Sequence, residues 1–295
     1  MKVPLLEERA RAARDMLASC ALCPRACGAN RLAGGRGFCR AGAAVRVAAV
    51  SLHFGEEPPI SGTRGSGTVF TSRCNLRCLF CQNYPISQLD AGRDMTPEEL
   101  GERLLWLADK GAHNVNFVTP TPHVPQIIEA LLFARTRGLA IPVVYNTNGY
   151  DSLETLALLD GIVDIYLPDR KYRTQALARE ASDAPDYPLH NARAVAEMVR
   201  QVGPLETDED GIARRGVLIR HLVLPGRVGE TAAVLAHIRR EFGADMPVSL
   251  MGQYFPAYEA PARPGYDRKL TAREYDRAIA AAVDLGLTNV AIQEI

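Results

Sequence analysis

The sequence predicts an α/β protein: a partial (β/α)6 barrel that follows a small cysteine-rich module. Three observations predict this fold class. Beyond residue 64, short apolar runs rich in β-branched residues alternate with segments of helical character. Each strand-like run is bounded by turn residues, as is typical of buried strands in a parallel sheet. Six or more β–α units in succession indicate a barrel or a partial barrel.

The expected elements follow one another along the chain. We expect strands over residues 68–71, 115–119, 141–146, 162–167, 217–224, 248–251 and 289–292. Helices are expected over residues 97–110, 124–137, 153–160, 192–202, 231–242 and 272–285. Thr96, before Pro97, and Thr271 are residue types that cap helix N-termini. Residues 172–215 form an insertion for such a barrel, and a solvated hairpin and a helix are expected there.

Composition argues against two classes of partner. The chain carries 34 basic and 34 acidic residues, whereas binding to nucleic acid or to an anionic membrane favours a basic excess.

The first 17 residues form an amphipathic segment without the apolar core of a signal peptide. No run approaches the roughly 18 apolar residues of a membrane span. We expect a cytoplasmic protein with no nucleic-acid or membrane partner, whose cysteines bind metal rather than form disulfides.

A metal-binding module is expected over residues 1–64, ahead of a barrel over residues 65–295. Four cysteines, Cys20, Cys23, Cys27 and Cys39, lie within 20 residues around a glycine-rich loop. Four thiolates favour zinc or an iron–sulfur cluster, with four free thiols as the alternative. The short Cys-x-x-Cys pair suits zinc, and the remaining spacing equally suits a [4Fe-4S] cluster. The glycine-rich loop slightly favours structural zinc.

The barrel is organised around a second set of three cysteines. Cys74, Cys78 and Cys81 have spacings of three and two residues and come directly after the first expected strand. Zinc and [4Fe-4S] sites normally have four protein ligands, so three thiolates leave one position open. An open iron is a place where chemistry can occur. A small zinc knuckle or three unrelated buried cysteines are the alternatives.

The segment CNLRCLFC resembles the CxxxCxΦC signature of radical S-adenosylmethionine (SAM) enzymes, with Phe80 at the aromatic position. The resemblance implies that Cys74, Cys78 and Cys81 hold a [4Fe-4S] cluster whose fourth iron is chelated by SAM. It also implies that the reduced cluster cleaves SAM to methionine and a 5′-deoxyadenosyl radical, which abstracts hydrogen from a substrate.

The order of the motifs further resembles the pyruvate formate-lyase activating enzyme branch, and above all PflX-type proteins, over nearly the whole chain. This resemblance implies a set of SAM contacts: Phe80 near the adenine; Asn146, Thr147 and Asn148 at the ribose and methionine; Asp169 and Lys171 at the carboxylate; Arg220 and Leu222 on the strand beside SAM; and Gln253 where activases have a histidine. Activases carry Gly-Gly-Glu after their second strand, where this chain has Thr119 to Pro122. The hydroxyls of Thr119 and Thr121 could accept from the SAM amino group instead.

Two classes of function remain open. The first is a radical SAM enzyme acting on a protein or peptide, including activation of a glycyl-radical enzyme, with an electron donor such as flavodoxin or ferredoxin. The second is a non-catalytic iron–sulfur or zinc protein acting in electron transfer or as a scaffold. Polar residues at the ends of several expected strands favour the first, because a carrier needs only its cluster and a docking face. The loop over residues 53–60 is expected to be a solvated turn, with His53, Glu56 and Glu57 as ligands the alternative.

Overall fold

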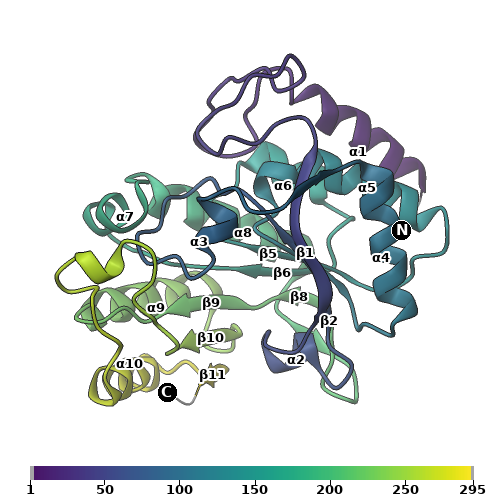
Figure 1. Ribbon diagram of the computed structural model, residues 1–295. Helices are drawn as coiled ribbons and strands as arrows, with labels where there is room; N and C mark the ends of the chain where they lie inside the picture. The colour runs from purple at the N-terminus through teal and green to yellow at the C-terminus, as the bar shows by residue number, and fades with distance from the viewer. Residues whose placement is uncertain (1–2, 294–295) are drawn as a thin grey trace.

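A computed structural model describes residues 3–293 and contains two connected sheets (Figure 1). Parallel strands β2 (Ser66–Thr71), β4 (Val115–Val118), β5 (Val143–Thr147) and β6 (Ile165–Pro168) lie side by side in this order. Parallel strands β9 (Ile219–Leu222), β10 (Val248–Met251) and β11 (Val290–Ile292) form the second sheet. A parallel bridge between Asp169 and Arg220 connects β6 to β9. The predicted α/β fold with a partial parallel barrel is confirmed.

One predicted strand differs from the structure. The run over residues 217–224 is divided between β8 (Ala213–Val217), which pairs with β6, and β9, which pairs with β10. Gly216 has a φ of 112°, a conformation that favours glycine, and Pro204 packs directly against it. The chain therefore changes sheets here, and β7 (Glu206–Thr207) pairs with β8 as a short antiparallel hairpin.

Helices cover the outer face of the barrel, mostly at the predicted positions. They are α4 (Pro97–Asp109), α5 (Val124–Arg135), α6 (Leu153–Leu159), α8 (Tyr187–Val202), α9 (Val228–Phe242) and α10 (Ala272–Asp284). Thr96 and Thr271 form the expected caps, each in a capping box with a glutamate three residues later. The shorter helical elements are α2 (Pro58–Ser61), α3 (Tyr84–Ser87), α7 (Gln175–Ser182), η1 (Thr121–His123) and η2 (Ala260–Ala262).

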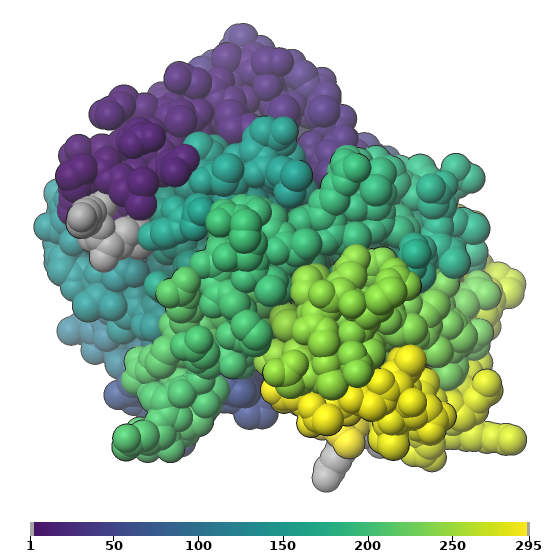
Figure 2. Space-filling view, turned by 180° about the vertical axis from the view of Figure 1, so that it is seen from behind, coloured from purple at the N-terminus to yellow at the C-terminus, as the bar shows by residue number. Residues whose placement is uncertain are grey.

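The N-terminal segment lies against the barrel. Helix α1 (Val3–Asp15) packs along α5, and its Leu6, Ala10 and Ala13 are buried in the main hydrophobic core. Strand β1 (Val45–His53) pairs antiparallel with β2, and β3 (Arg93–Met95) pairs with β1. Figure 2 shows the N-terminal segment and the C-terminal helices at opposite ends of one continuous surface. Within residues 3–293, no helix is both long enough and apolar enough to span a bilayer.

Candidate functional site

The three-cysteine loop leaves β2 at a backbone position fixed by an ion pair. Arg73 adopts a φ of 74° and is almost fully buried, and its Nε donates to Asp90 Oδ1 at 2.6 Å. Helix α7 supports the other side of the loop, because the carbonyls of Ala181 and Ser182 accept from the backbone N–H groups of Leu79 and Arg77. The loop is thus held by polar contacts from both sides.

Each sulfur of this loop has a hydrogen-bonding neighbour from another segment. Asn148 Nδ2 donates to Cys74 Sγ at 3.3 Å, and Ser182 Oγ donates to Cys78 Sγ at 2.9 Å. Ser87 Oγ lies 3.2 Å from Cys81 Sγ. Hydrogen bonds to ligand sulfurs are a means by which proteins orient and tune iron–sulfur centres. These surroundings fit three thiolates bound to a cluster.

Burial disfavours the thiolate forms of Cys74 and Cys78. It raises the pKa of Cys78 to about 11, and the Lys171 ammonium opposes that rise. Burial, with Cys78 as a neighbour, also raises the pKa of Cys74 well above its ordinary value. Metal ligation requires the thiolate form, so binding at this loop would release protons.

A cavity of about 210 Å³ borders Cys78 and Cys81. Its walls combine two cations and a carboxylate with apolar and aromatic side chains. Of the residues expected to contact SAM, it brings together Phe80, Asp169, Lys171, Arg220, Leu222 and Gln253. Phe80 also packs against Tyr254, with ring centroids 5.7 Å apart. Such a mixed lining fits a ligand that carries both an aromatic base and a zwitterionic end.

Asp169 connects the two cations of this cavity. Its Oδ2 accepts from Lys171 Nζ at 2.6 Å, and its Oδ1 accepts from Arg220 Nη2 at 2.9 Å. Burial alone would raise the pKa of Asp169, but Lys171 and Arg220 outweigh burial and hold that pKa below its ordinary value. Asp169 and Arg220 also form the parallel bridge between the two sheets, so these charged residues lie where the sheets meet.

The loop before α2 places two carboxylates inside the barrel, so the expected solvated turn is wrong. The side chains of Glu56 and Glu57 are only 8% and 6% exposed, and they lie 3.5 and 3.8 Å from Arg220. Asn146 Nδ2 donates to Glu56 at 3.1 Å, and Asn146 Oδ1 accepts from Arg220 at 2.7 Å. The sequence did offer a signal: the two acids directly precede Pro58, and an apolar strand follows. Sequence analysis read them as solvent-exposed because acidic pairs usually are.

The other predicted SAM contacts lie away from the cavity lining. Thr121 and Thr147 donate to the buried carboxylate of Asp151, each at 2.7 Å. Thr119 adopts a φ of 60° just beyond β4, and its carbonyl accepts from Thr71. Asn148 faces Cys74 rather than the cavity. Sequence analysis missed Asp151 and Ser182. Ser182 gave no signal because its partner Cys78 is 104 residues away along the chain, whereas Asp151 lies only four residues after its partner Thr147.

The four N-terminal cysteines line a second cavity. Cys20, Cys23, Cys27 and Cys39 all line it, together with Thr121 and Asn75. A Cβ atom at Gly37 would lie 2.2 Å from Cys27 Sγ, so glycine is required for this close approach. Within residues 3–293, no three His, Cys, Asp or Glu side chains are grouped as a ready site for one metal ion.

Comparisons with known proteins give a family match and two relatives. The model of the family described as "Radical SAM superfamily" matches residues 68–169, from β2 to Asp169. The uncharacterized protein MJ0674 of Methanocaldococcus jannaschii is 31% identical over 295 residues, covering 96% of this chain and 79% of that protein. A second uncharacterized protein of that organism, MJ0808, is 28% identical over 162 residues, covering 49% of this chain and 47% of that protein.

Solved structures resemble the fold at low identity. HydG, a maturase of the [FeFe]-hydrogenase, has a TM-score of 0.53 at 13% identity, covering 100% of this chain and 65% of HydG. SuiB of Streptococcus suis, bound to S-adenosylmethionine, has a TM-score of 0.48 at 14% identity, covering 75% of this chain. The chain spans about half the length of SuiB, 48%. At these identities the HydG likeness speaks for the fold alone.

Proposed function

Because the chain belongs to the radical SAM superfamily, we propose that Cys74, Cys78 and Cys81 hold a [4Fe-4S] cluster with one open iron that binds SAM. When bound, this pair supplies reductive cleavage of SAM to a 5′-deoxyadenosyl radical, which takes hydrogen from a substrate. The observation that carries the proposal is three sulfurs on one loop, each beside a hydrogen-bonding side chain, with Cys78 and Cys81 bordering a charged cavity.

The cavity residues would bind and orient SAM. Lys171 and Arg220 offer cationic donors for the SAM carboxylate, although Asp169 already accepts from both. The remaining acceptor capacity of Asp169 suits the SAM amino group, in the role for which activases use a glutamate. Phe80 and Leu222 offer apolar surface for the adenine. We place Asn146 behind Arg220 as a positioning residue rather than as a direct contact.

The substrate and partners follow the resemblance to activating enzymes. We propose a protein or peptide substrate, with activation of a glycyl-radical enzyme as the specific form, and a flavodoxin- or ferredoxin-type electron donor. We also propose that Cys20, Cys23, Cys27 and Cys39 bind a second metal centre within a module over residues 1–64. Four ligands leave no open position, so this centre would not bind SAM.

The test is SAM cleavage by the anaerobically reconstituted chain. With dithionite as reductant, the chain should form 5′-deoxyadenosine slowly without added substrate. Asp169→Asn should weaken SAM binding, because it removes the negative charge between Lys171 and Arg220. Asp160→Asn is the matched control, since Asp160 pairs with Arg200 on the surface. An intact reduced cluster that yields no 5′-deoxyadenosine would favour the non-catalytic alternative.

A further inference from the structure

A buried tyrosine hydroxyl lies where two loops of the proposed site meet. Tyr187 is the first residue of α8 and is fully buried. Its hydroxyl donates to the carbonyl oxygens of Asn148, after β5, at 2.8 Å and of Asp169, after β6, at 2.9 Å. The same hydroxyl accepts from the backbone N–H of Lys171 at 3.1 Å. One side chain therefore links the backbones of both loops.

A second side chain of α8 supports this junction. Asn191 is 1% exposed, and its Nδ2 donates to the carbonyls of Gly149 at 3.1 Å and of Asp169 at 2.9 Å. Gly149 has a φ of 74°, and a Cβ atom there would collide with Asn191 Nδ2 and lie 2.6 Å from the carbonyl oxygen of Asp169. Because only glycine permits this approach, the close contact between the two loops is encoded in the sequence.

The loop after β5 also reaches the three-cysteine loop. Asn148 Nδ2 donates to Cys74 Sγ at 3.3 Å and to Asn75 Oδ1 at 2.7 Å. The residue whose carbonyl accepts from Tyr187 thus carries the hydrogen-bond donor of one cluster-binding sulfur. Fixing the backbone of Asn148 fixes the position of that donor.

The loop after β6 carries charged residues of the proposed SAM cavity. Asp169 and Lys171 both line that cavity, and Tyr187 contacts the backbone of each. It therefore sets where their side chains begin, from behind the cavity wall. Burial raises the pKa of Tyr187 well above its ordinary value, so its hydroxyl keeps its proton and remains a donor at neutral pH.

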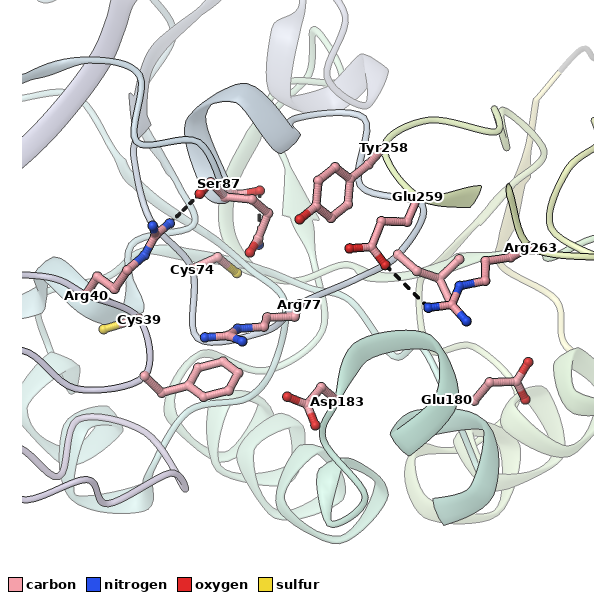
Figure 3. Close-up of a pocket in the computed structure, with 13 residues that line it drawn as sticks. Cys39, Arg40, Cys74, Arg77, Ser87, Glu180, Asp183, Tyr258, Glu259 and Arg263 are labelled. Atoms are coloured by element: carbon pink, nitrogen blue, oxygen red, sulfur yellow. Dashed lines mark hydrogen bonds and ion pairs between the residues drawn. The ribbon is translucent and has the colours of Figure 1, made fainter. Parts of the chain in front are cut away.

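A second tyrosine holds the donor of another sulfur in the same way. Tyr172 Oη lies 2.6 Å from Ser182 Oγ, and Ser182 Oγ donates to Cys78 Sγ at 2.9 Å. The rings of Tyr172 and Tyr187 pack edge to face, with centroids 5.4 Å apart. Figure 3 shows α7, with Glu180, beside the cysteine loop along a cavity of about 430 Å³. The α7–α8 segment, expected to be a solvated hairpin and a helix, instead supports the site from inside the protein.

We propose that Tyr187, supported by Asn191, is a positioning residue that serves the iron–sulfur centre and SAM together. The inference rests on the proposed function of the three-cysteine set. Through one hydroxyl, Tyr187 holds the donor to Cys74 Sγ on one side and the backbone of Asp169 and Lys171 on the other. Its removal should therefore disturb the centre before SAM is added, and weaken SAM binding as well.

The test compares Tyr187→Phe with the parent and with Tyr166→Phe, each reconstituted without oxygen. Tyr166 is the matched control, because it is also fully buried and its hydroxyl donates to Gln201 at 2.6 Å in the main hydrophobic core. Tyr187→Phe should raise the dissociation constant for SAM about tenfold, the effect of losing one buried hydrogen bond. It should also shift the electron paramagnetic resonance signal of the reduced centre without SAM. Tyr166→Phe should change neither.

Hydrogen exchange gives a readout that needs neither SAM nor reduction. The backbone N–H of Lys171 donates to the Tyr187 hydroxyl, so its exchange in the reconstituted chain should be about tenfold faster in Tyr187→Phe. The rate should stay at the parent value in Tyr166→Phe. If Tyr187→Phe fails to fold, Asn191→Ala takes its place with the same expectations for SAM affinity and for the resonance signal.

The outcomes separate this inference from the proposed function. A folded Tyr187→Phe chain with parent-like SAM affinity would overturn the inference and leave the proposed function intact. Weaker SAM binding with an unchanged signal would overturn the shared role, and equal weakening in Tyr166→Phe would show a general loss of packing instead. A parent chain with an intact reduced cluster that forms no 5′-deoxyadenosine would contradict the proposed function, and the inference with it.

Discussion

The two cysteine sets differ in what surrounds their sulfur atoms. Those of Cys74, Cys78 and Cys81 lie beside side chains from three separate segments, and Cys78 and Cys81 border a cavity with fixed charges. Those of Cys20, Cys23, Cys27 and Cys39 lie among turns and glycines, with a small apolar cluster around Leu17, Cys20 and Leu22. The first set is held in place by the barrel, whereas the second has little core of its own.

This difference separates two uses of thiolates. A cysteine set that side chains of other segments hold through hydrogen bonds keeps its geometry when one coordination position of its metal centre is open. The open position is then available for catalysis. A set with little surrounding core gains its geometry from the metal, and metal binding then contributes to folding. The following predictions test this distinction.

The largest expected effect is on the three-cysteine set. Replacing Cys74, Cys78 and Cys81 together by alanine should remove about four irons and all 5′-deoxyadenosine formation. The backbone contacts of the loop to Ala181 and Ser182 should preserve the fold. Iron analysis and circular dichroism measure both outcomes. Unchanged iron content would disprove the assignment of this set.

Loss of one N-terminal ligand should affect folding instead. Cys20→Ala should lower stability by on the order of 5 kcal/mol, because structural metal sites contribute at least this much in small modules. Ser19→Ala, at the exposed neighbouring position, is the control. Thermal unfolding and limited proteolysis between residues 20 and 42 report the effect. An unchanged melting temperature together with lost metal would show that the module folds without it.

Replacing Arg220 tests whether the charged residues around it are buried. Arg220→Met should cost about 3–5 kcal/mol, because Asp169, Glu56 and Glu57 would lose a shared buried cation. Arg200→Met, which breaks exposed pairs with Asp160 and Glu197, should cost much less, because solvent screens exposed ion pairs. Urea unfolding compares the two. Similar losses would mean that the charged group is not effectively buried.

The smallest expected effect concerns Glu56 and pH. Burial raises the pKa of Glu56 above its ordinary value of 4.5, with Glu57 adding to the rise and Arg220 opposing it. The folded chain therefore holds this proton more tightly than the unfolded chain, and the resulting stability is present at low pH and lost as pH rises through the folded pKa. Glu56→Gln should lose less stability than the parent between pH 4 and pH 7, because it has no proton to release at this position. A parallel pH dependence in both chains, measured by urea unfolding, would contradict this.

The fold could be predicted because its signals are local. Apolar strands, capped helices such as that after Thr96, and the cysteine spacing are each set by neighbours in sequence. The site was predicted less completely because its contacts are not local. Glu56 reaches Arg220, and Ser182 reaches Cys78, across more than 100 residues, with no periodicity to reveal them. Thr121 and Thr147 both donate to Asp151, and their contact with SAM stays a prediction.

The central claim is that only the three-cysteine set leaves an iron open for SAM. The most direct test is electron–nuclear double resonance of the reduced chain with SAM labelled at its amino nitrogen. The account predicts a hyperfine coupling from the labelled nitrogen in the parent and in Cys20→Ala/Cys39→Ala. That coupling should be absent when Cys74, Cys78 and Cys81 are replaced. No coupling in the parent, or a coupling that depends on the N-terminal cysteines, would contradict the account.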